Sequence, residues 1–341
     1  MHKLMIVAVV TLYASVMALG TAQAGATLDA VKGRGELVCG VNTGLEGFGR
    51  PDDQGNWTGL DVDTCRAVAA VILGDATKAK FVPRNASQRF PSLQSGEIDL
   101  LVRNTTWNLT RDTALGFNFA PVTFYDGQGF LVAKAAGVSS AKELSGATVC
   151  VQQGTTTELN LADYFRRHGL VLNPLVFADL ADAEAAFFAG RCDAFTADGS
   201  ALASIRAAKA GNPDDYVILP EVISKEPLAP VVRHGDDQFF DIVKWTVVAL
   251  IGAEELGITQ ADVEQMKGSD DPDIKRLLGV TPGNGEALGL DEEWAVRAIK
   301  AVGNYGEIFE RNVGRNTALR LERGLNALWT EGGLMYAMPL Y

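Results

Sequence analysis

Short apolar runs alternate along the chain with longer segments whose apolar residues recur at helical spacing. The helical segments include residues 61–74 and 156–169. Between such segments, four apolar runs each end abruptly in a polar loop, at residues 35–44, 100–106, 146–157 and 194–198. Strands that alternate with helices in this way predict an α/β protein with parallel sheets and right-handed crossovers.

The two halves of the chain follow one plan. In the first half, a helix-like segment ends in Gly96-x-x-Asp99, a short strand follows, and Asn104 stands five positions after the aspartate. The second half repeats this order with Gly190-x-x-Asp193 and Asp198. Helix, glycine and short strand also occur together by chance in α/β proteins, but here all four strands end in polar loops. Because ligands bind beyond the carboxyl ends of parallel strands, the pattern predicts two lobes that face one cleft.

Charge and composition narrow the range of partners and compartments. The formal net charge of −12 argues against a nucleic acid or an anionic membrane as partner. The first 24 residues combine one lysine, an interrupted apolar stretch and Ala22-Gln23-Ala24, so we expect a secretory signal peptide that is cleaved after Ala24. No later apolar run approaches the ~20 residues that span a bilayer. These features predict an exported, soluble protein.

The four cysteines of an exported protein predict two disulfides, for which three connectivities are possible. The two-lobe plan favours the pairing that keeps each bridge within one lobe. Cys39 with Cys65 then joins the first strand to the helix that follows it, and Cys150 with Cys192 joins two neighbouring strands of the second half. The lobes stay free to move against each other.

Four segments, taken in order, resemble a known family. They are DLLVRNTTWNLTRD, NFAPVTFYDGQGFLV, LSGATVCVQQGTTTE and GRCDAFTADGS, and the resemblance runs from about Gly35 to about Pro230. The set is similar to the extracellular amino-acid-binding proteins of ABC uptake systems (solute-binding protein family 3), and most similar to its general L-amino-acid-binding members. The resemblance implies a type II periplasmic binding fold, in which two α/β lobes joined by two crossing strands close around the ligand. It also implies a membrane permease as partner.

The resemblance implies a binding site for a zwitterion. Arg111 matches the family's arginine for the α-carboxylate, a role suited to its planar, permanently charged fork. Asp198 is expected to take the ammonium group from the other lobe. Further donors are expected from the positions that match the family's polar loops, namely Asn104, Thr106, Gln152, Thr155 and Thr156.

Several of these residues have a structural alternative. Arg111 could pair with Asp112 or Asp99 at the surface instead of binding a ligand. Asp198 is well placed to cap a helix that starts at Gly199, and residues 155–157 could cap a helix that starts at Glu158. Trp107 is interpreted as a packing residue.

The first polar loop departs from the pattern of single-ligand relatives. Many of those proteins place an aromatic residue there, against the ligand side chain, whereas this chain places Leu45 there. Phe48 is interpreted as core or loop packing, and Glu46 is the one charged candidate in the loop. A broad range of L-amino acids is therefore the expected ligand spectrum.

The expected organisation is residues 1–24 as signal peptide, 25–130 and 229–341 as lobe 1 with C-terminal helices, and 131–228 as lobe 2. The tail should contain helices over 237–257, 270–279, 290–314 and 317–333. Its large apolar residues are interpreted as core, namely Trp294, Ile299, Phe309, Leu325, Leu328 and Trp329.

An enzyme on the same fold, such as a cyclohexadienyl-type dehydratase, is the main alternative. It would need a general acid or base in the cleft, and Asp198 or Glu46 would have to serve. Outside the expected signal peptide the only histidines are His168 and His234, both in predicted exposed turns. The cysteines lack the spacing of a zinc site. We therefore expect a monomeric binding protein that uses no cofactor or metal and has no catalytic residues.

Overall fold

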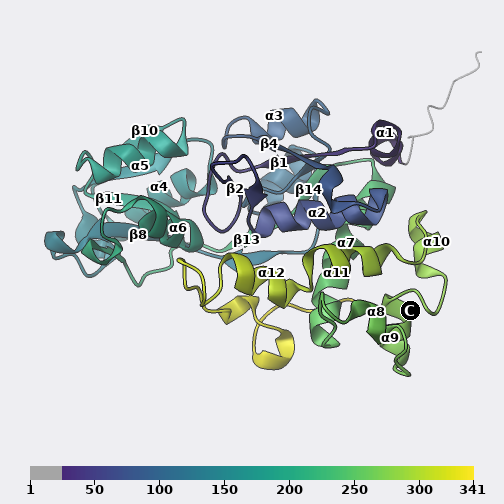
Figure 1. The fold of residues 1–341 in the computed structure, drawn as a ribbon. Coiled ribbons are helices and arrows are strands. Elements are labelled where there is room, and N and C mark those ends of the chain that lie inside the picture. The colour runs from purple at the N-terminus through teal and green to yellow at the C-terminus, as the bar shows by residue number, and fades with distance from the viewer. Residues whose placement is uncertain (1–24) are drawn as a thin grey trace, which may run out of the picture.

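The computed structural model describes residues 25–341, so the expected signal peptide lies outside the described residues. Two lobes lie side by side, each built on a five-stranded sheet (Figure 1). The first sheet has the order β4-β1-β5-β14-β6. Its strands are β1 (Leu37–Val41), β4 (Ala79–Pro83), β5 (Leu100–Leu101), β6 (Phe117–Phe119) and β14 (Val231–Arg233).

The second sheet has the order β10-β9-β11-β8-β12. Its strands are β8 (Gln128–Ala133), β9 (Thr148–Gln152), β10 (Asn173–Phe177), β11 (Ala194–Asp198) and β12 (Tyr216–Ile218). In each sheet only the fourth strand, β14 or β8, runs antiparallel to its neighbours. The repeated plan is therefore present, but the sheets are mixed and not wholly parallel. The reversed strand is the one that the chain forms on entering from the other lobe.

Two crossing segments join the lobes. β7 (Phe124–Asp126) pairs antiparallel with β13 (Glu226–Leu228), with Asp126 opposite Glu226. The first crossing leads directly into β8 and the second into β14. The expected boundary after residue 130 falls inside β8, which begins at Gln128.

Helices cover both sheets. In the first lobe these are α1 (Ala26–Arg34), α2 (Leu60–Leu73) and α3 (Arg89–Gln94), and in the second α4 (Thr156–His168), α5 (Leu180–Phe188) and α6 (Gly199–Lys209). α2 carries Asp61 and Asp63 in its first turn, where the helix dipole favours negative charge, and it ends at Gly74. Nearly all of its residues are buried, because α2 lies between the first sheet and the C-terminal helices.

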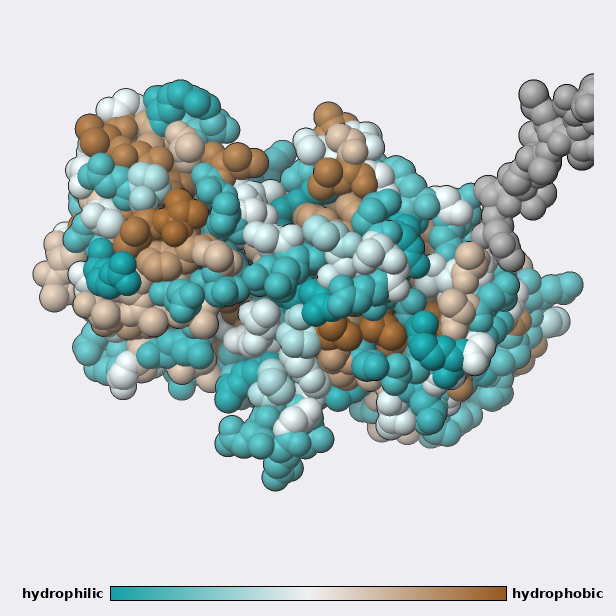
Figure 2. Space-filling model, turned by 90° about the horizontal axis from the view of Figure 1, so that it is seen from above, coloured by the Kyte–Doolittle hydropathy of each residue, from teal (hydrophilic) through white to brown (hydrophobic). Residues whose placement is uncertain are grey.

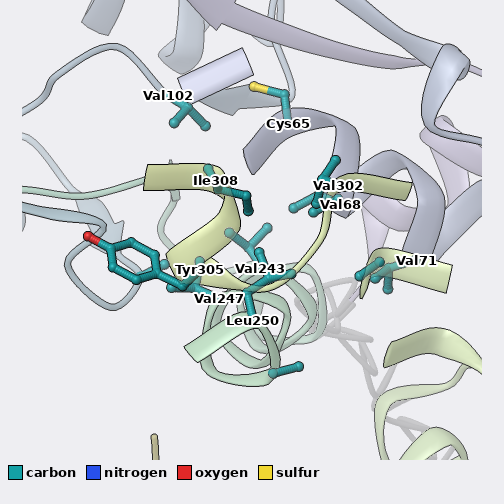
Figure 3. Packing of buried hydrophobic residues seen from close by; sticks show 14 of the residues in the cluster. Cys65, Val68, Val71, Val102, Val243, Val247, Leu250, Val302, Tyr305 and Ile308 are labelled. Atoms are coloured by element: carbon teal, nitrogen blue, oxygen red, sulfur yellow. The ribbon is translucent and has the colours of Figure 1, made fainter. Parts of the chain in front are cut away.

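The C-terminal helices complete the core of the first lobe. They are α7 (Asp237–Glu255), α8 (Val263–Met266), α9 (Pro272–Leu277), α10 (Asn284–Leu288), α11 (Trp294–Val302) and α12 (Tyr305–Asn312). Figure 3 shows Val68 of α2 facing Val243 of α7 and Ile308 of α12 in one cluster. The tail, which carried no assigned role in the sequence, therefore seals the outer side of α2.

Two expectations for the tail are wrong. Residues 317–333 form only short 3-10 turns, η6 (Gly324–Asn326) and η7 (Trp329–Glu331), because the backbone is left-handed within the segment at Arg320 (φ 50°) and Gly324 (φ 49°). Leu325 and Trp329 are 55% and 53% exposed, since they lie on these surface turns. Trp294, Ile299, Phe309 and Leu328 are buried, as predicted.

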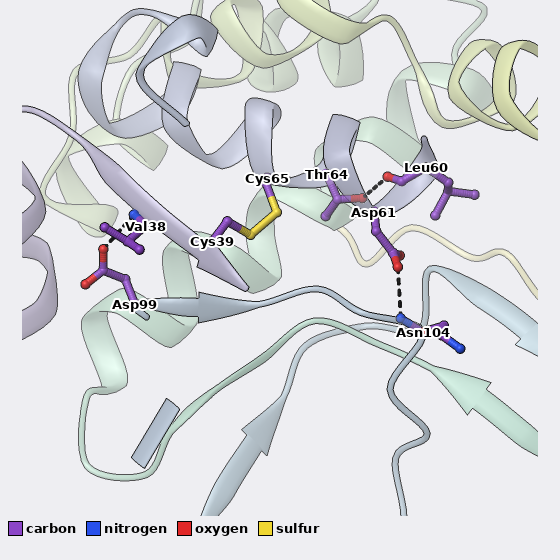
Figure 4. Close-up of a disulfide and its surroundings, with 8 residues drawn as sticks. All are labelled: Val38, Cys39, Leu60, Asp61, Thr64, Cys65, Asp99 and Asn104. Atoms are coloured by element: carbon purple, nitrogen blue, oxygen red, sulfur yellow. Dashed lines mark hydrogen bonds between the residues drawn. A yellow bond between two sulfur atoms is a disulfide. The ribbon is translucent and has the colours of Figure 1, made fainter. Parts of the chain in front are cut away.

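Both disulfides have the predicted pairing. Cys39 bonds to Cys65 and Cys150 to Cys192, each within one lobe. Figure 4 shows the first bridge fastening α2 to β1. Across the described range, residues 25–341, no helix combines the length and apolarity that a bilayer crossing requires. Hydrophilic residues dominate the face drawn in Figure 2, with hydrophobic patches interspersed.

Candidate ligand-binding site

A cavity of about 40 Å³ lies between the lobes, at the carboxyl ends of β1, β5, β9 and β11. We call it the inner cavity. Seven of the eight predicted ligand-binding residues line it, and Arg111 is the exception. From the first lobe the lining includes Asn42, Leu45, Arg89, Arg103, Asn104 and Thr106, and from the second Gln152, Thr155, Thr156, Thr157, Leu180, Thr196 and Asp198.

Arg111 lies behind the wall of the inner cavity, in a single π-helical turn (η2, Thr110–Ala114). Its Nη1 donates to the carbonyl oxygen of Thr106 at 2.8 Å, and its guanidinium lies 5.2 Å from the centre of the Phe90 ring. Burial lowers the pKa of Arg111 to about 10, an effect that the charges of Glu226 and Asp198 oppose. Arg111 is thus buried and oriented by the same loop that supplies Thr106.

The alternative surface pairings of Arg111 are not present. Asp112 accepts a hydrogen bond from Trp107 Nε1 at 2.7 Å, and Asp99 accepts from the backbone N–H of Val38 at 2.8 Å and pairs with Arg34. Both carboxylates therefore make structural contacts with residues other than Arg111. The bond from Val38 to Asp99 is drawn in Figure 4.

Arg89, at the start of α3, is a cavity-lining cation that the sequence reasoning missed. The residue is 2% exposed, its Nη1 lies 3.5 Å from Thr105 Oγ1, and its Nε has no hydrogen-bond partner among residues 25–341. Burial, followed by the charges of Arg111 and Arg103, lowers its pKa well below the ordinary value. A buried donor without a partner is costly, which marks Arg89 as a group that can receive an anion.

Asp198, at the end of β11, brings a carboxylate from the second lobe. It is buried, and its pKa is raised well above the ordinary value, first by burial and then by the charges of Asp126 and Glu226. Arg89 and Asn104 oppose this rise. A cationic group placed among these carboxylates would relieve their repulsion.

The capping alternative for Asp198 is not realised by its side chain. Asp198 occupies the N-cap position of α6 but makes no capping hydrogen bond. Asp126, on the crossing strand β7, accepts from the backbone N–H of Ser200 at 3.2 Å and also from its hydroxyl. Because Asp126 satisfies the start of α6, the carboxylate of Asp198 is left to the inner cavity.

Asn104 is held in an uncommon conformation at the cavity wall. Its φ is 32°, in the left-handed region that asparagine tolerates better than most residues. Its backbone N–H donates to Asp61 Oδ2 at 2.8 Å (Figure 4), and its Oδ1 accepts from Asn42 Nδ2 at 2.9 Å. Burial raises the pKa of Asp61 to about 7, against the effect of that hydrogen bond and of Arg103. The loop after β5 is thus fixed from α2 and from β1.

The two threonines at the start of α4, Thr155 and Thr156, make different contacts. Thr155 caps α4, because its Oγ1 accepts from the backbone N–H of Glu158 at 3.2 Å, and it also donates to the carbonyl of Gln152 at 2.7 Å. Thr156 Oγ1 donates to Glu226 at 2.8 Å. Gly154 has a φ of 74°, and a side chain there would come within 3.1 Å of Ser87 in the first lobe, so this loop approaches the other lobe closely.

Glu226, on β13, is a second residue that the sequence reasoning missed. Its carboxylate accepts from Thr106 of the first lobe at 2.5 Å and from Thr156 and Asn160 of the second lobe, both at 2.8 Å. Thr106 and Thr156 also lie 3.4 Å apart through their hydroxyl oxygens. The crossing strand therefore ties both lobes together directly beneath the inner cavity, and the lobes are closed.

The remaining candidates are distributed between cavity and core. Leu45 lines the inner cavity, whereas Glu46 pairs with Arg50 outside it. Phe48 packs edge-on against Phe124 at 5.2 Å in the core, as predicted. Trp107 does not line the inner cavity and stacks on Phe119 at 6.0 Å, in agreement with its interpretation as a packing residue.

Acid–base chemistry by histidine is not available at this site. His168 and His234 are both exposed, as predicted, and neither lines the inner cavity. What the site offers is three buried arginines on the first lobe, Arg89, Arg103 and Arg111, and a buried carboxylate on the second, which suits a small molecule that carries both charges.

The chain is similar to known proteins over most of its length. Residues 37–314 match the family described as bacterial extracellular solute-binding proteins, family 3. The chain is 60% identical, over 96% of both chains, to the general L-amino acid-binding periplasmic protein AapJ of Rhizobium johnstonii. It is 56% identical to the glutamate/glutamine/aspartate/asparagine-binding protein BztA of Rhodobacter capsulatus, over 93% of this chain and 94% of that protein.

A solved structure is similar over nearly the whole chain. It is an ABC transporter or periplasmic binding protein from Brucella ovis with glutathione bound, and it superposes with a TM-score of 0.91 at 58% identity. The match covers 92% of this chain and 99% of that one.

Proposed function

The chain belongs to family 3 of the bacterial extracellular solute-binding proteins, and on this premise we propose that it captures free L-amino acids of several side-chain classes by lobe closure and delivers them to an ABC permease. The observation that carries the proposal is the distribution of charge across the inner cavity. In the first lobe, the side chains of Arg89 and Arg103 line the cavity and Arg111 lies behind its wall, and in the second lobe Asp198 brings a carboxylate to the lining. A zwitterion bridges these groups only when the lobes are closed.

In the proposed complex the α-carboxylate lies against the first lobe. Arg111 supplies charge and fixes the loop that carries Thr106, and the partnerless Nε of Arg89 supplies a further donor. Asn104 completes the carboxylate's hydrogen bonds through its side-chain amide, and Thr106 through its backbone N–H, because the hydroxyl proton of Thr106 is already donated to Glu226. Bidentate and charge-assisted bonds of this kind are the strong ones in a cavity that excludes water.

The ammonium group lies against the second lobe in this proposal. Asp198 accepts from it, and Gln152, Thr155 and Thr156 supply the remaining polar contacts from the loop before α4. Capture is then a shift in population: the ligand binds the closed state more tightly than the open state, because only closure brings both sets of contacts to it.

The breadth of the ligand spectrum follows from what faces the ligand side chain. Leu45 is apolar and makes no directed bond, and Glu46 is engaged by Arg50. The printed names of two relatives, one a general L-amino-acid binder and one a binder of four acidic and amide amino acids, support several ligands over one. The Brucella ovis protein holds glutathione, which is a tripeptide, so the proposed ligand spectrum extends beyond free amino acids.

The dehydratase alternative has no support in these observations. The relatives with high identity are named as binding proteins and not as enzymes. We therefore assign no catalytic activity.

The proposal also covers export, location, oligomeric state and lobe limits. We propose that the protein is exported with cleavage after Ala24, is periplasmic and is a monomer. The proposed lobes are residues 25–130 with 229–341 and residues 131–228. The periplasmic names of the relatives support the location. The exchange of sheets at the two crossings supports the lobe limits to within a few residues.

Calorimetric titration tests the proposal. The protein is stripped of bound ligand by unfolding and refolding, and is then titrated with each L-amino acid and with several D-isomers. Saturable binding of L-amino acids from more than one side-chain class, with the D-isomers much weaker, is the expected result. Failure of a refolded protein to bind any L-amino acid overturns the proposal.

A further inference from the structure

A second cavity of about 280 Å³ adjoins the inner cavity, and we call it the outer chamber. The two share Leu45 of the first lobe and Leu180 of the second, which form the wall between them. The outer chamber is lined on the first-lobe side by the loop from Thr43 to Pro51. On the second-lobe side it is lined by α5 and α6, through Ala181, Glu184, Ser204, Ala208 and Lys209.

The sizes of the two spaces set a limit on what the inner cavity holds. Its 40 Å³ corresponds to roughly three water molecules, at about 10–15 Å³ for each. That is enough for the charged head of an amino acid and little more. A longer ligand must pass between Leu45 and Leu180, and the outer chamber is seven times larger.

The outer chamber presents polar groups of both kinds. Glu184 is 5% exposed and lies 3.8 Å from the Lys209 ammonium, a distance that leaves the pair loosely bonded. Across the chamber, Glu46 pairs with Arg50 from the first lobe. The side chains of Lys209 and Arg50 are about half exposed, so both can turn toward a bound anion or carbonyl group. This lining suits the polar backbone of a second residue better than an apolar side chain.

The inner cavity dictates how that second residue is attached. Arginine groups on one side and Asp198 on the other require that both the α-carboxylate and the α-ammonium stay free and charged. An ordinary peptide bond removes one of these charges, so an α-linked dipeptide leaves a buried charge of the protein without a partner. Only a ligand that grows from its side chain meets both conditions.

We infer that the outer chamber binds the distal part of amino acids that carry a second residue on their side chain, the class of the γ-glutamyl peptides. This inference rests on the proposed function, because the head of such a ligand occupies the inner cavity as a free amino acid does. The distal residue then lies between the loop 43–51 and the helices α5 and α6, with its carboxylate near Lys209 or Arg50.

Titration with matched ligands tests the inference. The ligands are L-glutamate, γ-L-glutamylglycine and α-L-glutamylglycine. The γ-linked dipeptide is expected to bind within about tenfold of glutamate, and the α-linked one at least 100-fold more weakly, which is about 3 kcal/mol. The variant Ala208→Trp fills the outer chamber from an exposed helix position, and it should weaken the γ-linked ligand at least tenfold while leaving glutamate unchanged.

Ala162→Trp is the matched control, since this exposed alanine on α4 lines neither cavity, and it should change nothing. Glutamate binding without γ-linked binding, or γ-linked binding that Ala208→Trp leaves intact, overturns the outer chamber as a subsite and leaves the proposed function standing. Equal binding of the α-linked dipeptide overturns the attachment argument. A wild-type protein that binds neither glutamate nor the γ-linked dipeptide overturns the inference, and one that binds no L-amino acid at all overturns the proposed function as well.

Discussion

Replacing Asp198 by asparagine should weaken ligand binding and stabilise the ligand-free protein at the same time. The carboxylate is buried beside those of Asp126 and Glu226, and this surrounding raises its pKa well above the ordinary value. In the ligand-free protein, the charged form therefore opposes folding. In the proposed complex, the same charge holds the ammonium. Asparagine keeps the shape and removes both effects.

The size of the loss in binding free energy depends on the carboxylates that remain beside position 198. Removing one partner of a buried charge pair costs about 2–5 kcal/mol. Because Asp126 and Glu226 stay in place and keep the surroundings negative, the lower part of that range applies, about 2–3 kcal/mol. Titration calorimetry should then show affinity for L-amino acids reduced by roughly 30- to 150-fold.

The gain in stability has a defined pH dependence. A carboxyl group whose native pKa is raised contributes full stability below its unfolded pKa of 3.8, and this contribution is lost as pH rises through the native value. Asparagine has no such loss. The melting temperature of the ligand-free variant should therefore exceed that of the wild type by a margin that grows as pH rises above about 4, as scanning calorimetry at several pH values would show.

Asp193→Asn is the control for this experiment. Asp193 precedes the other end of β11, where it accepts from the backbone N–H of Thr148 at 2.7 Å, a bond that asparagine can also accept. The Asp193→Asn variant should bind L-amino acids with unchanged affinity. Undiminished affinity in Asp198→Asn, or a variant less stable than the wild type at every pH, would refute the assignment of Asp198 to the ammonium.

Three sets of variants and one linkage experiment extend the account. Arg111→Ala should abolish binding of all amino acids alike in calorimetric titrations, because Arg111 supplies charge to the carboxylate site that they share and fixes the loop that carries Thr106. A loss of binding confined to one side-chain class would contradict that role. Leu45→Tyr should narrow the ligand range, and an unchanged affinity profile would place Leu45 outside the ligand contacts. Binding should release protons, because burial raises the pKa of Asp198 and the ligand ammonium favours the charged form of its carboxyl group. The heat of binding at one pH should therefore differ between phosphate and Tris, and equal heats in the two buffers would contradict this proton release. Replacing Cys150 and Cys192 together by alanine should lower the unfolding free energy by about 4 kcal/mol, from a bridge between residues 42 positions apart, with affinity unchanged because the bridge lies within one lobe; chemical denaturation and titration of the same sample check both.

The sequence predicted much of the architecture because the relevant patterns are local. Each apolar run that ends in a polar loop became a strand end at the cleft, and the repeated spacing became two sheets with the same strand order. The disulfides followed from that plan. The reversal of β8 and β14 was not predicted, since strand direction depends on which lobe the chain enters from.

The residues that were missed are those whose role depends on distant partners. Arg89 begins a short helix, where an arginine is usually solvated, and only the folded chain buries it beneath the inner cavity. Glu226 lies 120 residues from Thr106, to which it is hydrogen bonded. The side chain that caps α6 is that of Asp126, on the crossing strand β7. The sequence reasoning considered Asp198 for this cap, because Asp198 directly precedes α6 along the chain.

Closure on the ligand is the central claim, and small-angle X-ray scattering tests it most directly. The ligand-stripped protein is measured with and without a saturating L-amino acid that calorimetry has shown to bind. We predict that the radius of gyration decreases on binding, and that Asp198→Asn at the same ligand concentration decreases less. A radius of gyration that stays constant while the wild-type protein is saturated would contradict capture by lobe closure.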